Sequence, residues 1–199
     1  AVDQVAYANE KGIDFIICDH HRPGDELPKA VAILDPKRPD CTYPFKELSG
    51  CGIGFKLAQA FNQKQNKPIS KIKRFLDLVV ISIASDIVPI VGENRILAYF
   101  GLKLLNSKPR PGIEAILAFG GIRKVDHTAE SGDNHLYFNR EMTISDLVFL
   151  VGPRINAAGR IESGSNSVEL LLCTDIESAS EIGKYIDTNN TERRNLDVT

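Results

Sequence analysis

The chain has 199 residues, of which 43% are hydrophobic and 25% charged, and its formal net charge is −2. These values are typical of a folded globular protein with a substantial core, and they exclude a disordered, collagen-like or generally basic DNA-coating chain. The longest apolar stretch, around Leu76 to Val91, is interrupted by polar and acidic residues. We therefore predict neither a transmembrane span nor a signal peptide.

The first residues, from Val2 to Lys11, have the apolar spacing of an amphipathic helix, and Gly12 follows at the position that favours a left-handed cap. The chain does not begin with Met and opens in what resembles the middle of a helix. We therefore expect a piece of a longer protein. Four cysteines without Cys-x-x-Cys spacing are interpreted as reduced thiols in a cytoplasmic protein; they are Cys18, Cys41, Cys51 and Cys173.

A short apolar run, Phe15 to Cys18, ends abruptly in Asp19, His20 and His21. Such a run is typical of a buried strand in a parallel sheet, and ligands usually bind beyond the carboxyl ends of those strands. Successive side chains on an extended segment point to opposite sides, so we expect the two imidazoles to have separate roles. A polar turn with two solvated histidines is the alternative. The neighbouring carboxylate and the buried strand favour a functional site.

A second buried strand is predicted over residues 30–34, where Asp35-Pro36 ends it. The alternation of helix and strand indicates an α/β fold, and the strand that should precede the first helix is absent from the chain. Glycines from Ser49 to Gly54 precede a helix at 55–61. They allow either an anion at the helix N-terminus or close packing of the helix on the sheet.

A strongly apolar helix is predicted from Ser70 to about Ala84, and Asp86 lies just after its C-terminal end. A carboxylate at a buried helix C-terminus is costly unless a cation compensates its charge. Metal binding and simple capping of the turn before Pro89 are about equally supported by the residues alone. Two further helices, at 93–105 and 112–119, are expected to be scaffold.

The polar segment 124–140 contains His127 and His135 without regular ligand spacing, so we predict an exposed loop or hairpin there. Thr143 and Asp146 have the spacing of a capping box for a helix over 147–151. Gly152-Pro153 is expected to break that helix.

After this break, Arg154, Asn156 and Arg160 offer many hydrogen-bond donors within a short space. A guanidinium suits phosphate oxygens, but an arginine ion-paired to carboxylates that support a metal site is an equally open interpretation. Residues 175–199 predict a final, mostly polar helix. Other local positive charges are taken as solvated surface; they are Lys71, Lys73, Arg74, Lys108, Arg110, Arg193 and Arg194.

Three segments in this order resemble a known family. Asp19-His20-His21 after a hydrophobic strand resembles the signature of the DHH phosphoesterase superfamily. Two segments, 84–89 (Ala-Ser-Asp-Ile-Val-Pro) and 152–160 (Gly-Pro-Arg-Ile-Asn-Ala-Ala-Gly-Arg), resemble its RecJ-like branch of single-strand-specific exonucleases. The resemblance covers nearly the whole chain. It implies a truncated, helix-rich parallel-sheet DHH domain over 1–174, and at 175–199 the start of a helix linking to a second domain.

The resemblance also implies the roles of individual residues. His20 and Asp86 would bind one of two divalent ions, Mn²⁺ or Mg²⁺, and Asp19 would orient the histidine pair. His21, Arg154, Asn156 and Arg160 would face the substrate phosphate. The family's other carboxylate ligands lie on upstream strands that this chain lacks, so we expect an incomplete metal site, an inactive fragment, and self-association through the exposed strand edge or a helix folded over it.

The implied activity is 5′ to 3′ digestion of single-stranded DNA in cytoplasmic recombination and repair, without a membrane partner. The alternatives are a superfamily phosphoesterase acting on oligonucleotides, cyclic dinucleotides or polyphosphate, and a catalytically inactive scaffold domain. The Pro-Arg-Ile-Asn-Ala-Ala-Gly-Arg segment argues against the first alternative.

Overall fold

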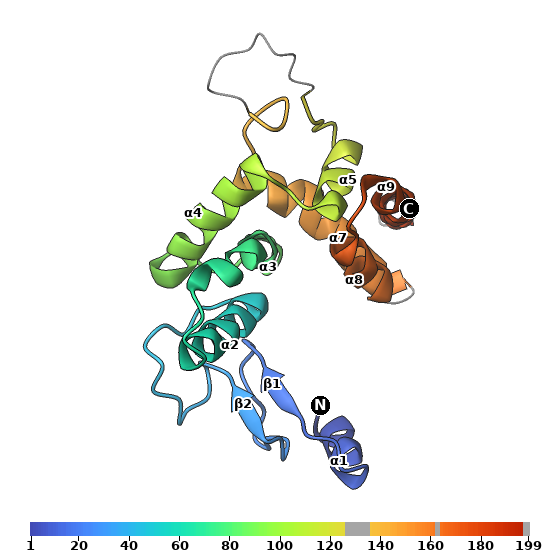
Figure 1. The fold of residues 1–199 in the computed structure, drawn as a ribbon. Coiled ribbons are helices and arrows are strands. Elements are labelled where there is room, and N and C mark those ends of the chain that lie inside the picture. The colour runs from blue at the N-terminus through green and yellow to red at the C-terminus, as the bar shows by residue number, and fades with distance from the viewer. Residues whose placement is uncertain (126–135, 162–163, 197–199) are drawn as a thin grey trace. The chain divides into compact units, whose positions relative to one another are not determined.

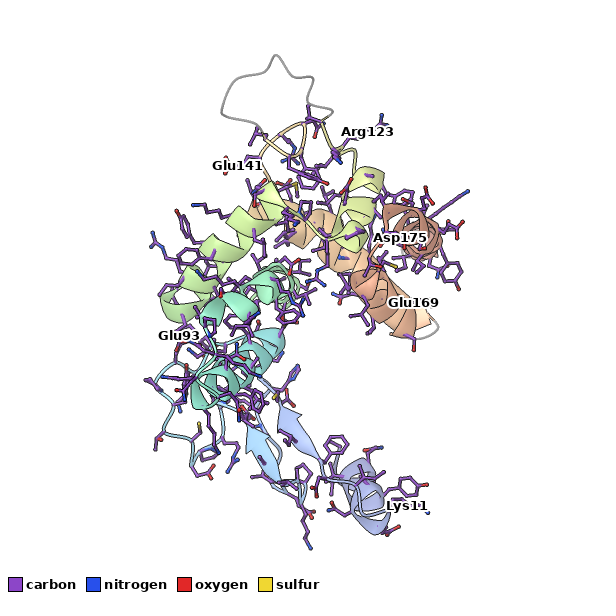
Figure 2. The ribbon with its side chains drawn as sticks, viewed as in Figure 1. Lys11, Glu93, Arg123, Glu141, Glu169 and Asp175 are labelled. Carbon is purple, nitrogen blue, oxygen red and sulfur yellow. The ribbon has the colours of Figure 1, made fainter. Side chains whose placement is uncertain are left out.

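The elements follow an α-β-β-α order and then continue as helices (Figure 1). The structure is a computed structural model that describes residues 1–125, 136–161 and 164–196, with the side chains at 157–161 and 192–196 excepted. The chain divides into two compact units, Ala1–Ala98 and Tyr99–Thr199. Each unit has its own core.

Unit 1 begins with α1 (Val2–Glu10), which ends as the sequence predicts. Gly12 adopts φ 70°, and the backbone N–H of Ile13 donates to the carbonyl of Ala8 at 2.9 Å. This left-handed cap reverses the chain into β1 (Ile16–Cys18). β1 pairs in parallel with β2 (Ala32–Leu34), with Ile17 opposite Ile33. The predicted α/β architecture is therefore confirmed, with a small parallel sheet. The prediction that the first strand is buried is wrong in this structure, because Ile16 is 55% exposed.

The remaining elements of unit 1 are α2 (Gly50–Lys64), two 3₁₀ turns, η1 (Ile69–Lys71) and η2 (Lys73–Phe75), α3 (Leu76–Ser85) and the start of α4 (Gly92–Ser107). The prediction of a single helix from Ser70 to Ala84 is thus wrong for its first half, which forms 3₁₀ turns. Ile69, Ile72 and Phe75 are spaced by three, which suits 3₁₀ turns, and the N–H of Phe75 donates to the Ile72 carbonyl at 2.9 Å.

The core of unit 1 is built around α3. Val79 and Val80 are fully buried, and Ile83 of α3 and Ile53 of α2 are nearly so. Each such aliphatic side chain contributes about 1.5–3 kcal/mol when it leaves water. α3 and α2 pack against each other, and α2 also contacts β1. The packing of these two helices fixes the end of α3 near the end of β1.

Unit 2 contains the rest of α4, then α5 (Pro111–Phe119), α6 (Ile144–Asp146), a π-helical turn, η3 (Leu147–Val151), α7 (Gly152–Ile161), α8 (Ser165–Leu172) and α9 (Ile176–Leu196). α5 packs on α9 and α8, and α7 packs on α9. Gly112 permits the approach of α5 to α8, because a β-carbon there would lie 2.0 Å from the carbonyl oxygen of Leu170.

The expected break at Gly152-Pro153 is wrong. Gly152 keeps helical angles (φ −52°, ψ −50°), and the helix continues through η3 into α7. Proline lacks an N–H, but Pro153 is the second residue of α7 and follows the π turn after Gly152 alone, where the hydrogen-bond pattern is already shifted. The capping box of Thr143 and Asp146 is confirmed.

The other sequence predictions for this part of the chain have mixed outcomes. Lys124 and Phe138 form an isolated antiparallel bridge, in agreement with a hairpin, whereas His127 and His135 lie outside the described residues. The four cysteines are free thiols. Among the helices that the structure describes, none is long and apolar enough to cross a membrane.

Candidate functional site

Asp19, His20 and His21 follow directly on β1. The N–H of Asp19 donates to the carbonyl of Leu34 at 3.0 Å, which extends the β1–β2 pairing by one residue before the chain turns. The ladder therefore fixes the backbone at Asp19.

The Asp19 carboxylate organises the turn. Its Oδ1 accepts from the backbone N–H of His20 at 2.7 Å, from the backbone N–H of His21 at 3.1 Å, and from Nδ1 of His21 at 2.7 Å. Burial of the carboxyl group opposes its ionisation, but these hydrogen bonds from His21 and His20 outweigh that effect and lower the pKa of Asp19 below its ordinary value. With Nδ1 of His21 donating to Asp19, Nε2 of His21 is left to face a ligand.

The sequence analysis predicted that the imidazoles of His20 and His21 point to opposite sides of an extended strand, but in the structure the two rings lie side by side. Their ring centroids lie 4.3 Å apart with an interplanar angle of 56°. The prediction is wrong because β1 ends at Cys18, and the Asp19 turn replaces the extended backbone on which alternation depends. The side chain of His20 is 15% exposed and that of His21 is 77% exposed, so the His20 ring is largely buried and the His21 ring faces solvent.

Asp86 lies at the C-terminal end of α3. The next residue, Ile87, has φ 51°, and the N–H of Val88 donates to the carbonyl of Ile83 at 3.3 Å. This is the reversal usually made by glycine, and a β-branched residue in it is strained. The reversal ends α3 at Asp86 and turns the following chain away.

His20 and Asp86 come together at the centre of the candidate site. Nε2 of His20 lies 3.7 Å from Oδ2 of Asp86, whose side chain is 34% exposed. The carboxylate is therefore less buried than the apolar helix before it suggested, and the cost of its charge is correspondingly smaller.

Ser82 is a site residue that the sequence reasoning missed, because it was counted only as an interruption of an apolar helix. Its Oγ donates to Oδ2 of Asp86 at 3.1 Å and accepts from the backbone N–H of Cys51 at 3.3 Å. The available signal was the spacing of four between Ser82 and Asp86, which places both on one helix face. The hydroxyl links the first turn of α2 to the Asp86 carboxylate.

The first turn of α2 also borders His20. Ser49 caps the helix by accepting from the N–H of Gly52 at 3.2 Å. A β-carbon on Gly50 would lie 3.5 Å from Cδ2 of His20, an ordinary van der Waals distance. The His20 ring thus packs on the start of α2, and the glycines bring a helix N-terminus next to the candidate site.

The donor set of His20 and Asp86 fits one divalent cation. Two ligands of one ion at about 2.1 Å lie at most about 4 Å apart, and the 3.7 Å between Nε2 and Oδ2 is within that limit. Within residues 1–125, 136–161 and 164–196, no group of three or more His, Cys, Asp or Glu side chains converges as a metal site. The described residues therefore offer a pair of ligands.

The remaining predicted site residues belong to unit 2. Nε of Arg154 pairs with Oδ1 of Asp187 on α9 at 2.7 Å, and its Nη1 donates to the carbonyl of Leu150 at 2.8 Å. Arg154 is thus partly engaged in tying α7 to α9. Asn156 is exposed on α7, and the Arg160 side chain lies outside the described part of the structure.

Comparison with known proteins finds a family model that is similar to most of the first unit. The model of the DHH family, N-terminal domain, matches residues 1–83, which include the Asp-His-His turn. Residues 1–83 therefore resemble the N-terminal domain of the DHH family. The family resemblance seen in the sequence is therefore confirmed.

Beyond the DHH match, the chain is similar over nearly its whole length to single-stranded-DNA-specific exonucleases named RecJ. It is 39% identical to that of Bacillus subtilis over 98% of this chain and 22% of that protein. It is 35% identical to that of Escherichia coli over 97% of this chain and 33% of that protein. The chain thus spans at most about a third of these two relatives.

Solved structures show the same fold. A crystal structure of exonuclease RecJ bound to manganese matches with a TM-score of 0.75 and 24% identity, over 98% of this chain and 45% of that one. RecJ in complex with Mn²⁺ from Thermus thermophilus matches with a TM-score of 0.76 over 98% of this chain and 27% of that one. The chain therefore shares its fold with these RecJ structures.

Proposed function

We propose that this chain is part of the catalytic domain of a divalent-metal-dependent exonuclease that digests single-stranded DNA from the 5′ end. The observation that carries the proposal is the pairing of His20 and Asp86 across two different elements, with 3.7 Å between their ligand atoms. The names of the relatives from Bacillus subtilis and Escherichia coli support the substrate class. A role in cytoplasmic DNA recombination and repair belongs to the same proposal.

The proposed metal is Mn²⁺ or Mg²⁺. A ligand set of one imidazole and one carboxylate suits Mn²⁺. Mg²⁺ can bind at the same site if water and oxygen ligands complete its coordination shell. RecJ structures in complex with Mn²⁺ and with Mg²⁺ support this choice. An ion held by His20 and Asp86 would supply Lewis-acid chemistry, namely activation of the attacking water and stabilisation of charge on the phosphoryl oxygens.

The protein side chains have separate roles in this proposal. Asp19 holds Nδ1 of His21, so that the exposed Nε2 is aimed at the substrate phosphate. Ser82 donates to Oδ2 of Asp86, the oxygen that lies near Nε2 of His20, and so restrains the orientation of the carboxylate. Both restraints lower the cost of organising the site when the ion arrives.

We assign Arg154, Asn156 and Arg160 to phosphate binding, with a second role for Arg154. Its ion pair with Asp187 supports a structural contribution as well, because two of its guanidinium nitrogens already have partners within unit 2. In the same proposal, residues 1–174 belong to the catalytic domain, and residues 175–199 are the start of a helix that links it to a second domain.

The test is digestion of a single-stranded oligonucleotide by the intact protein, with the label at the 5′ end or the 3′ end and a duplex as control. We expect metal-dependent release of mononucleotides from the 5′ label first. His20→Ala and Asp86→Ala should each remove nearly all activity, while circular dichroism and melting temperature stay close to parental. Normal turnover by either variant at limiting Mn²⁺ would contradict the proposal.

A further inference from the structure

A strongly basic segment surrounds the end of α2 that lies away from the candidate metal centre. From Leu48 to Leu76 the sequence contains six lysines and arginines and no acidic residue, in a chain whose net charge is −2. Four of these cations are lysines that follow one another closely and are exposed; they are Lys64, Lys67, Lys71 and Lys73. Because α2 has 15 residues, its end lies about 20 Å from the first turn that borders His20.

The backbone reverses sharply at this end and fixes the direction of Lys67. Asn66 adopts φ 53°, and the N–H of Lys67 donates to the carbonyl of Asn62 at 2.8 Å. Asparagine tolerates this left-handed conformation better than most residues. The reversal carries Nζ of Lys67 to 6.0 Å from the centre of the Phe61 ring.

Phe61 is an aromatic side chain that the fold leaves in solvent. It is 57% exposed, although it lies on a helix whose opposite face is buried in the core. An exposed aromatic ring beside a cation is the combination by which proteins hold single-stranded nucleic acid. A base stacks on the ring, and the cation neutralises a phosphate.

A small polar cavity of about 200 Å³ lies beside the Phe61–Lys67 pair. Its lining residues are Gln59, Asn62, Gln63, Lys67, Ile69 and Ile72. Asn62 is only 9% exposed. Its Nδ2 is buried and lacks a hydrogen-bond partner among the described residues. A buried donor without a partner is destabilising, so an acceptor entering this cavity is favoured.

We infer that Phe61, Lys64, Lys67 and the Asn62 cavity, which we call the α2-end surface, bind a stretch of single-stranded nucleic acid. In this surface Phe61 stacks on a base, Lys64 and Lys67 contact phosphates, and Nδ2 of Asn62 donates to an oxygen or ring nitrogen acceptor. The inference deepens the proposed function and rests on it for the identity of the strand. An acidic protein would satisfy the lysines and could accept from the amide donor, but its carboxylates would leave the exposed ring without a stacking partner.

The test is fluorescence anisotropy with a labelled oligodeoxythymidylate, using the intact protein in EDTA so that no hydrolysis occurs. Lys64→Gln/Lys67→Gln should weaken binding and reduce the slope of log affinity against log salt by about 1.4, since each phosphate contact on a single strand contributes about 0.7. Phe61→Ala should weaken binding about five-fold or more. The matched control, Lys29→Gln/Lys103→Gln, removes two exposed lysines elsewhere and should change neither quantity.

A second measurement locates the strand. An oligonucleotide that carries 5-iodouracil should cross-link under ultraviolet light to the peptide containing Phe61. Parental affinity and salt slope in the lysine variant would overturn the inference. So would polyglutamate that competes as well as the oligonucleotide while Phe61→Ala has no effect, because that result indicates an acidic protein partner.

The two proposals fail separately. If the protein digests single-stranded DNA but the lysine and Phe61 variants bind it like the parent, this inference is wrong and the proposed function stands. If binding depends on the α2-end surface but no digestion occurs, the proposed function is wrong and the surface stands.

Discussion

Replacing Ser82 with alanine tests the hydrogen-bond arrangement behind the candidate metal centre. The hydroxyl donates to Oδ2 of Asp86 at 3.1 Å, and that same oxygen lies 3.7 Å from Nε2 of His20. Without the hydroxyl, the carboxylate is free to rotate away, and the backbone N–H of Cys51 loses its acceptor at 3.3 Å. The substitution changes no charge and removes one oxygen atom.

The expected magnitude follows from what the hydroxyl contacts. Groups that orient a metal ligand are worth about 10- to 100-fold in metal affinity or activity. The cost in the free energy of unfolding is smaller, about 0.5–1.5 kcal/mol for one net hydrogen bond, because Asp86 is partly exposed and water replaces the hydroxyl there. Ser82→Ala should therefore act mainly on metal binding.

The assay is the rate of single-stranded DNA digestion by the intact protein as a function of Mn²⁺ concentration. We expect the Mn²⁺ midpoint to rise about 10- to 100-fold while the rate at saturating Mn²⁺ stays close to parental. Ser180→Ala is the control, because its Oγ donates to the carbonyl of Ile176 within α9 in the same helical manner. An unchanged Mn²⁺ midpoint in Ser82→Ala would refute the reasoning.

Three further outcomes are expected. Arg154→Lys should lower the free energy of unfolding by about 1–3 kcal/mol in urea denaturation, because lysine cannot keep both the Asp187 and the Leu150 contacts; parental stability would contradict this. The hydrogen bonds of Arg140 lower the folded-state pKa of Asp146 below its ordinary 3.8, so its stabilisation is present above that value and lost as the pH falls below it. The stability difference between the parent and Asp146→Asn should accordingly shrink from pH 5 toward lower pH, and a constant difference would be contrary evidence. Residues 1–199 alone should bind Mn²⁺ weakly and show no nuclease activity, and micromolar two-site binding by calorimetry would contradict this.

The features that the sequence could predict are those with a strong local cause. Gly12 marks the left-handed end of α1, the Thr143–Asp146 capping box starts a helix, and the apolar run before Asp19 is a parallel strand. Each depends on residues close together in the chain. For the same reason, the positions of the Asp-His-His turn and of Asp86 at the ends of their elements were predictable.

The features that were mispredicted depend on contacts or on helix geometry that local patterns do not encode. A proline normally ends a helix, but Pro153 follows a π turn in which the backbone hydrogen-bond pattern is already shifted, so the helix continues without the N–H of Pro153. The adjacency of the His20 and His21 rings arises from the turn that the Asp19 side chain makes. The role of Ser82 follows from the packing of α2 on α3, which joins residues 31 positions apart.

The central claim is that His20 and Asp86 bind the same divalent ion, and the coupling of bound Mn²⁺ to histidine nitrogen tests it most directly. Pulsed electron paramagnetic resonance on the intact protein, with ¹⁵N-labelled histidine, reports whether an imidazole nitrogen is coordinated. We predict a ¹⁵N coupling that disappears in His20→Ala and persists in His21→Ala, together with weaker Mn²⁺ binding in Asp86→Asn. A coupling that survives in His20→Ala, or Mn²⁺ affinity unchanged in Asp86→Asn, would contradict the claim.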